Sequence, residues 1–340
     1  MNTIDKQERP RGRFRVGLRA GGGLLFSLVA IVAVIWWALN QQTPTFPTGT
    51  RAILLLAAGV GGYAAATVGR AVRWHLILEL ADVDHHYSDA MALTPIGFMA
   101  NNVLPARAGE LVRVFLMKTR SSATRREIFG SIIAERLLDT VSLIALFAVM
   151  TVIGIAGAPT GRISAVFAAL TLGAGAAGAG LLILLRRRGR LERFATVARP
   201  FLRASRLLLC RRGAALVLAT SIIWLFEGLV YWLVARALEL PVTYADGVYL
   251  VVLASLAAIV PAGPGFIGTV DAAIIFGLGA IGIKGGQALS FDILLRFVVF
   301  VPITVVGLLL MLRYGGLGKL RSRAARTAED SGARPGSAEC

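Results

Sequence analysis

Long uninterrupted apolar runs dominate this 340-residue chain. A helix of about 20 apolar residues is long enough to cross the hydrocarbon core of a bilayer. Only 16% of the residues are charged and 56% are hydrophobic, whereas soluble domains usually carry about 25% charge. We therefore exclude a soluble fold and predict an all-α polytopic membrane protein. The apolar runs are Gly21–Leu39, Ala52–Gly69, Ser88–Leu104, Ile128–Gly157, Ile163–Leu185, Gly213–Ala235, Ala245–Val260, Phe266–Ile283 and Ile293–Leu312.

The positive charges predict how these runs cross the membrane, because cytoplasmic loops carry an excess of Lys and Arg. Thirty of the 36 Lys and Arg lie in residues 1–20, 70–126, 186–212 and 313–340. They share one side only if residues 88–120 enter and leave the membrane on that side, and residues 245–283 do the same from the other side. The prediction is six full spans plus two re-entrant helical hairpins, in the cytoplasmic (inner) membrane, with both termini cytoplasmic.

The same pattern divides the chain into parts. We expect a basic cytoplasmic tail (1–20), a first membrane half (21–157) containing the hairpin 88–120, and a second membrane half (158–313). The second half contains the hairpin 245–283 and a basic cytoplasmic loop (186–212). Residues 314–340, which are rich in Arg, Ala, Gly and Ser, are expected to be a disordered cytoplasmic tail.

The two halves also share an internal repeat. Trp74, Tyr87, Asp89 and Pro105 recur with almost the same spacing as Trp232, Tyr244, Asp246 and Pro261. Each half would contain three spans and one hairpin, and an odd number of crossings makes the two copies opposite in topology. Inverted repeats are typical of secondary transporters, whose substrate site lies near the midplane at the repeat interface.

The predicted hairpin tips are Asn101–Glu110 and Val260–Thr269, and both contain Pro and Gly. A new helix begins after each tip, so its free N–H groups and positive dipole end would point into the membrane interior. Arg107 and Arg113 add full charges there. The tips therefore predict a site for a phosphate or carboxylate, although ordinary Pro-Gly loops with surface arginines would have the same sequence.

Ionisable residues inside the apolar runs are the second signal, because charges are costly in hydrocarbon and usually face a polar interior. Glu135, Arg136 and Asp139 lie in one run, while Asp292 and Arg296 form an i,i+4 pair in the second half, at roughly the repeat-equivalent place. Two interpretations stay open for the first group, namely substrate binding and structural ion pairing. Two further carboxylates, Glu227 and Asp271, stand alone in apolar surroundings.

The remaining polar features predict no cofactor. His75, His85 and His86 lie in a polar stretch without fixed ligand spacing, which favours a solvated loop over a metal site. The two cysteines have no ligand spacing either. The net charge of +17 would suggest nucleic acid in a soluble protein, but here an anionic membrane surface is the expected partner and nucleic acid is not.

Three ordered motifs resemble a known family. They are N-N-x-L-P-x-R-x-G-E at Asn101–Glu110, E-R-x-x-D at Glu135–Asp139 and P-x-G-x-G-x-x-G-T-x-[DE]-A ending at Asp271–Ala272. They are similar to the lysylphosphatidylglycerol synthase transmembrane-region family, also called flippase-like membrane proteins, and the resemblance extends from about Gly21 to Arg313. The family's last motif more often ends in Glu-Ala, so Asp271 keeps the charge with a shorter reach.

The resemblance implies a role in lipid movement. In larger members a soluble aminoacyl-transferase domain makes the lysyl-lipid and the membrane region moves it to the outer leaflet. This sequence has about 27 residues after its last predicted span, so we expect no transferase domain and no enzymatic activity.

We therefore expect a lipid translocator that binds an anionic headgroup. An ion-coupled transporter of a small anion, with Glu135, Asp139 or Asp271 taking up protons, is the first alternative. A scaffold that recruits enzymes through residues 186–212 is another, whereas the usual residues of a lipid-phosphate enzyme are missing. The identity of the lipid and the oligomeric state, a homodimer included, stay open. The expected substrate-binding residues are Asn101, Asn102, Arg107, Glu110, Arg113, Glu135, Arg136, Asp139, Gly263, Gly265, Gly268, Asp271 and Arg296.

Overall fold

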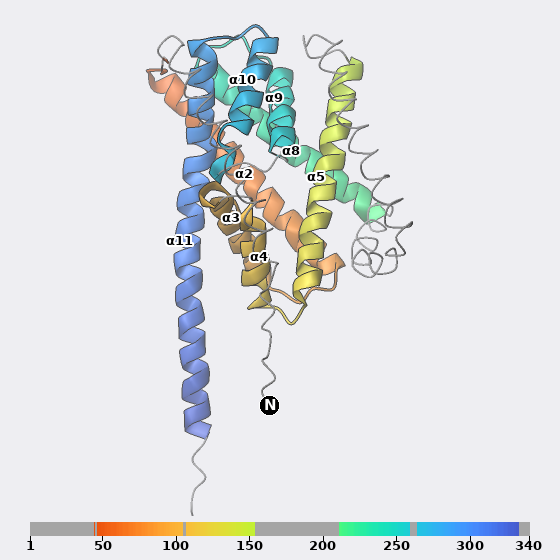
Figure 1. Cartoon of the computed structure of the whole chain (residues 1–340), viewed down its shortest axis with the longest axis vertical. Helices are drawn as coiled ribbons and strands as arrows, with labels where there is room; N and C mark the ends of the chain where they lie inside the picture. The colour runs from red at the N-terminus through yellow and green to blue at the C-terminus, as the bar shows by residue number, and fades with distance from the viewer. Residues whose placement is uncertain (1–43, 45, 105–106, 154–210, 259–263, 333–340) are drawn as a thin grey trace, which may run out of the picture.

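The computed structural model describes residues 44, 46–104, 107–153, 211–258 and 264–332, with side chains up to residue 314 in the last helix. All regular structure in this part of the chain is helical, which confirms the all-α prediction (Figure 1). The elements are α2 (Thr50–Leu80), α3 (Tyr87–Val103), α4 (Ala108–Lys118), α5 (Arg125–Ile153), α8 (Arg211–Ala237), α9 (Tyr244–Ala257), the short 3₁₀ helix η1 (Pro264–Phe266), α10 (Thr269–Ala280) and α11 (Gly286–Gly332). The predicted spans Gly21–Leu39 and Ile163–Leu185, the tail 1–20, most of the loop 186–212 and Gly263 lie outside the described residues.

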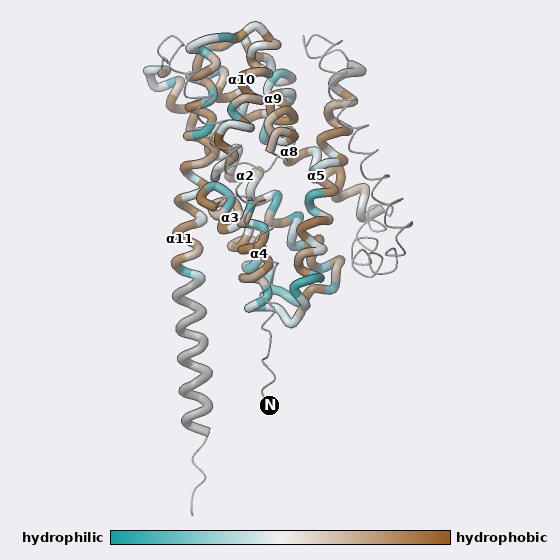
Figure 2. Tube along the Cα trace, viewed as in Figure 1, coloured by the Kyte–Doolittle hydropathy of each residue, from teal (hydrophilic) through white to brown (hydrophobic). Residues whose placement is uncertain are grey.

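Three helices among the described residues are long and apolar enough to cross a membrane, namely Thr50–Leu80, Gly213–Ala237 and Gly286–Tyr314. Large apolar side chains also lie on the outside of these helices, including Leu54, Leu218 and Phe297. Figure 2 shows the apolar colouring along α2, α8 and the upper part of α11. An exterior this apolar is suited to contact with lipid chains.

The repeated residues of the sequence begin two equivalent helices. In α3, the backbone N–H of His86 donates to Asp89 Oδ2 at 3.3 Å, and in α9 the N–H of Thr243 donates to Asp246 Oδ2 at 2.9 Å. An acidic residue at the third helical position that accepts this bond is half of a capping box. The repeat of Asp89 and Asp246 therefore marks two helix starts with the same local structure.

The short helices form two pairs, with α9 and α10 in the upper part of Figure 1 and α3 and α4 below them. The first pair, α3 and α4, is held close by glycine, because a Cβ on Gly109 would lie 2.0 Å from the Gly97 carbonyl oxygen. Asn101 Oδ1 also accepts the N–H of Gly109 at 2.8 Å. The second pair, α9 and α10, is joined through η1, which packs against α3. The ends of the two pairs thus meet near the middle of the molecule.

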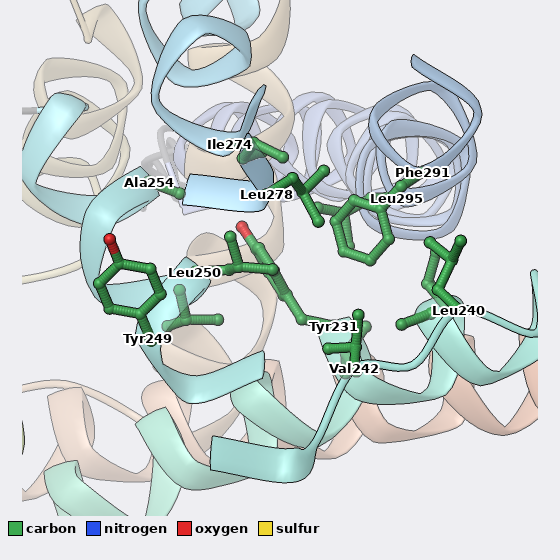
Figure 3. Close-up of a cluster of buried hydrophobic side chains, with 14 of the residues drawn as sticks. Tyr231, Leu240, Val242, Tyr249, Leu250, Ala254, Ile274, Leu278, Phe291 and Leu295 are labelled. Carbon is green, nitrogen blue, oxygen red and sulfur yellow. The ribbon is translucent and has the colours of Figure 1, made fainter. Parts of the chain in front are cut away.

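A large apolar core holds the second pair in place. Figure 3 shows Leu250 of α9, Leu278 of α10 and Phe291 of α11 around Tyr231 of α8, and all four side chains are buried. The rings of Tyr231 and Phe291 are 6.2 Å apart between centroids. This packing determines where α10 and α11 place their charged residues.

The last helix differs from the sequence expectation. A disordered tail was expected from residue 314, but the backbone of α11 continues as helix to Gly332. Residues 319–328 contain mainly Ala, Arg, Lys and Leu, which have high helix propensity. Near the end of its apolar part, the hydroxyl of Tyr314 donates to Asp89 Oδ1 at 2.5 Å, so α11 also contacts the start of α3.

Candidate functional site

A buried network of charges joins four helices. Arg73 of α2 binds Asp139 Oδ1 at 2.6 Å and Glu135 Oε1 at 3.2 Å, both on α5, and donates to Thr220 Oγ1 of α8 at 3.0 Å. Arg113 of α4 binds Glu135 Oε2 at 2.9 Å. The side chains of Arg73, Arg113 and Glu135 are each only 1% exposed. Glu135 therefore links two arginines inside the protein.

Arg113 is oriented by an aromatic ring. Its guanidinium lies 3.9 Å from the ring centroid of Trp74, and the indole N–H of Trp74 donates to Ser131 Oγ at 3.1 Å. Arg113 was expected at the headgroup site, but in the structure it faces the interior. Its geometry is that of a structural ion pair with Glu135.

The accessible part of the network lies beside this core. Arg136 Nε is 2.9 Å from Glu110 Oε1, and Arg136 Nη1 is 3.2 Å from Asp139 Oδ2. Arg107 Nε is 3.9 Å from Glu110 Oε1. The side chains of Arg107, Glu110 and Arg136 are 28%, 20% and 30% exposed. The structure thus brings together Arg107, Glu110, Arg136 and Asp139 at one partly open surface, which we call the arginine surface.

Arg107 occupies an unusual backbone position. It precedes the first residue of α4 with φ of 55°, in the left-handed region that residues other than Gly rarely adopt. Its guanidinium lies 5.4 Å from the ring centroid of Phe266 in η1. Arg107 therefore stands at the helix N-terminus, where the dipole favours an anion, and contacts the other helix pair.

The arginine surface and the buried network behind it have unequal numbers of charges. Among the described residues they contain four arginines, Arg73, Arg107, Arg113 and Arg136, and three carboxylates, Glu110, Glu135 and Asp139. One positive charge is left over. Asp139 is shared between the buried Arg73 and the partly exposed Arg136. The two arginines of the arginine surface therefore have less than two full carboxylate charges as partners, and an anion could neutralise the remainder there.

A second cluster lies in the other half. Arg296 of α11 forms an ion pair with Asp271 of α10, its Nη1 donates to the Gly265 carbonyl oxygen at 3.2 Å, and its Nε is 4.0 Å from Asp292 Oδ2. Asp271 also accepts the N–H of Gly268 at 2.6 Å. Gly265 has φ of 64° and Gly268 of 94°, which favours glycine at both positions. We call Asp271, Asp292 and Arg296 the aspartate cluster.

The two asparagines of the first motif have structural roles in this conformation. Asn101 bonds to Gly109, as described above, and Asn102 Nδ2 donates to Thr304 Oγ1 of α11 at 2.9 Å. Both side chains help to join the first helix pair to its neighbours. Both are also close to Arg107 in sequence.

Two arginines of α2 were missed by the sequence analysis. Arg70 and Arg73 were counted with the cytoplasmic charges, as was Arg113, but all three are buried. Arg70 forms an ion pair with Glu227 of α8, so Glu227 does not stand alone. Because α2 continues past the apolar run Ala52–Gly69 to Leu80, Arg70 and Arg73 lie three residues apart on one helix face.

A metal site is not formed by the described residues, since no group of three His, Cys, Asp or Glu among them could hold an ion. His75 and His85 are instead bonded to each other, with Nδ1 and Nε2 2.8 Å apart, and His75 is 3.3 Å from Glu79. The predicted histidine stretch is therefore a small polar cluster at the end of α2.

The apolar exterior, the helices long enough to cross a bilayer and the internal charges define an integral membrane protein. The chain belongs to the family described as the lysylphosphatidylglycerol synthase TM region, whose profile matches residues 23–307. It is also similar to a UPF0104 membrane protein of Pyrococcus horikoshii, with 25% identity over 124 residues. That alignment covers 36% of this chain and 37% of the relative's length. No solved structure matches the chain.

Proposed function

We propose that this protein is a flippase-like translocator that moves a phospholipid or another lipid with an anionic headgroup between the two leaflets. The observation that carries the proposal is the arginine surface, where Arg107 and Arg136 remain partly exposed; together with the buried network behind it, this surface has one positive charge in excess. A charged side chain in the centre of a membrane helix costs at least about 2.5–3.5 kcal/mol. Partly exposed arginines at such a place are expected to have a function.

The chemistry of the guanidinium group suits a phosphate. Arginine presents two parallel N–H donors that match two phosphate oxygens, and the N–H groups at the start of α4 add to the attraction. The acyl chains of the lipid would stay outside, against the exposed apolar side chains of the helices. Only the headgroup would need to pass through the polar interior.

The proposal includes a topology. The helix pairs α3–α4 and α9–α10 would be re-entrant hairpins that enter from opposite faces, within six full spans arranged as inverted repeats. Their opposite positions and their contact through η1 support this arrangement (Figure 1). We further propose the cytoplasmic membrane as the location, cytoplasmic termini, anionic lipid as the partner and no enzymatic activity.

A vesicle assay tests the function. The purified protein would be reconstituted with a fluorescent anionic phospholipid or its zwitterionic analogue, and the transfer of each between leaflets measured by quenching from outside. The wild type should move the anionic lipid faster. Arg136→Ala should abolish this difference, whereas the control Arg125→Ala, which removes an exposed arginine that contacts the ring of Phe115, should keep it. Equal rates for protein-free and wild-type vesicles would overturn the proposal.

An ion-coupled transporter of a small anion is the second candidate, because the aspartate cluster holds a carboxylate in excess next to the same site. A small anion would need no path for acyl chains. Uptake of radioactive phosphate by the same vesicles, without lipid transfer, would favour this candidate.

A further inference from the structure

We propose that Asp292, together with Asp271, forms a proton-binding site whose occupancy controls the arginine surface. The inference deepens the proposed function, because it assigns proton coupling to the headgroup translocation. It rests on the aspartate cluster, which has two carboxylates and one guanidinium.

The contacts distinguish the two aspartates. Asp271 is satisfied, since one carboxylate oxygen pairs with Arg296 and the other accepts the N–H of Gly268. Asp292 is 4.0 Å from the same guanidinium, and its Oδ1 is buried without a hydrogen-bond partner. The side chain of Asp292 is only 6% exposed. Asp292 is therefore the carboxylate whose charge is not compensated.

Among the residues that the structure describes, the groups around Asp292 supply no second positive charge. It faces Asp271 of α10 and Arg296 of α11, and the phenol of Tyr231 of α8 lies within reach of its charge. Beyond Tyr231, Glu227 is paired with Arg70 beside Tyr63 of α2. Tyr249 of α9 interacts with the charge of Asp246 instead. An unpaired buried carboxylate is costly, so binding of a cation to Asp292 is favoured.

The cation that fits is a proton. Metal ions such as Ca²⁺ need six or more oxygen ligands, whereas both oxygens of Asp271 are already occupied. A proton needs one oxygen, and Asp292 Oδ1 is free. Asp292 takes up H⁺ from water to become a neutral carboxylic acid, and returns the same proton on release. Two carboxylates that share a site commonly hold one proton between them.

A short chain of contacts joins this site to the arginine surface. Arg296 holds the Gly265 carbonyl oxygen, Phe266 follows in the chain, and the ring of Phe266 contacts the guanidinium of Arg107. When Asp292 is ionised, it competes with Asp271 for Arg296. When Asp292 is protonated, Arg296 stays with Asp271. Proton binding thus selects the position of η1, which touches the headgroup site.

The charges also complement each other. The arginine surface, with the buried network behind it, has one positive charge in excess, and the aspartate cluster has one negative charge in excess. An anionic headgroup bound at the arginine surface and a proton bound at the aspartate cluster would leave both sites neutral. This lowers the electrostatic cost of holding these charges inside a bilayer while the headgroup moves.

Infrared difference spectroscopy of the purified protein tests the proton site without any transport assay. When the pH is lowered from about 9 to about 6, the wild type should gain a carboxylic acid C=O band. Ordinary carboxyl groups titrate below this range and would not contribute. Asp292→Asn should lose this band, whereas Asp246→Asn, at a buried aspartate that caps α9, should keep it. A wild type without the band, or Asp292→Asn with an unchanged band, would overturn the proposal.

Asp292→Glu is the control for a folding defect. It keeps a carboxylic acid at this position and should retain the band at a shifted frequency. Coupling is then measured in vesicles with an imposed pH difference. The wild-type translocation rate should change by up to about tenfold per pH unit, as for one linked proton, and this dependence should vanish in Asp292→Asn. If the band behaves as expected but no lipid moves, the proton site stands and the translocator assignment fails. A proton site with a pH-independent translocation rate would overturn the coupling.

Discussion

Arg136 of α5 lies with its Nε 2.9 Å from Oε1 of Glu110 in the first turn of α4. The contact joins two motifs that are separate in the sequence. It places Arg136 of α5 next to Arg107, which precedes the first residue of α4. Glu110 is suited to its position, because a carboxylate in the first turn of a helix interacts favourably with the dipole. The arginine surface is thus assembled from two segments.

Replacing Arg107 should affect transport much more than stability. We expect Arg107→Ala to lower anionic lipid translocation in vesicles at least about tenfold, because one donor pair of the headgroup site is lost. Arg107→Lys should retain part of the activity, since a point charge still attracts phosphate. Thermal unfolding in detergent should change little, because Arg107 is 28% exposed.

Arg107→Ala and Arg107→Lys can be compared directly, because the backbone strain at residue 107 is the same in both. Ala and Lys carry the same strain at the left-handed position of residue 107, where φ is 55°, so a difference between them reports the charge. If both variants transported normally, the headgroup site would lie elsewhere. If both failed to fold, Arg107 would be structural.

Replacing Arg113 should have the opposite effect. Arg113→Met removes one of the two buried guanidiniums that bind Glu135. Glu135 keeps Arg73, so the cost should stay below the about 3–5 kcal/mol of leaving a buried charge without a partner. We expect a clearly lower unfolding temperature in detergent, with a smaller decrease for Arg136→Met at its 30% exposed site. Normal stability of Arg113→Met combined with lost translocation would instead show that Arg113 contacts the headgroup.

Gly109 is expected to tolerate no side chain. The Cβ of Gly109→Ala would meet the Gly97 carbonyl oxygen at 2.0 Å and Asn101 Oδ1 at 2.6 Å, which would force α3 and α4 apart. We expect a lower unfolding temperature for this variant. Gly61→Ala is the matched control, because nothing lies within 4 Å of its Cβ and Ala favours helix more than Gly. Similar stability of the two variants would contradict the close packing of the first pair.

Cysteine labelling tests the topology. Lys118 ends α4 and Lys284 precedes α11. In Figure 1 the start of α11 lies at the top, whereas the end of α4 lies at the lower end of the shorter helices. With Cys210 and Cys340 replaced by Ser, an impermeant maleimide added to intact cells should label Lys284→Cys but not Lys118→Cys. Labelling of Lys118→Cys from outside would contradict the re-entrant arrangement of α3 and α4.

The helices themselves were predictable because apolar runs and helix-start residues are local signals. The expected run Ser88–Leu104 corresponds to α3 at Tyr87–Val103 and the expected run Gly213–Ala235 to α8 at Arg211–Ala237. The far end of α11 was missed, since polar residues 314–332 resemble a disordered tail by composition although their propensity favours helix.

The partners of the charges were not predictable to the same extent. Glu135 is bound by Arg73 and Arg113, which lie 62 and 22 residues away in the chain, and only the packing of α2 and α4 on α5 brings them there. A count of positive charges treats every arginine outside an apolar run as exposed, so it assigned Arg70 and Arg73 to a cytoplasmic stretch. Buried arginines make such a count less decisive than it looks.

One further consequence concerns α11 as a mechanical element. This helix contacts the second pair through Arg296 and the start of the first pair through Tyr314, which are about 27 Å apart along its axis at 1.5 Å per residue. A sliding of α11 along its axis would therefore move both helix pairs at once. Pro302 lies between the two contacts and removes one backbone hydrogen bond from the helix. A bend of α11 at Pro302 would let one helix pair move while the other keeps its position.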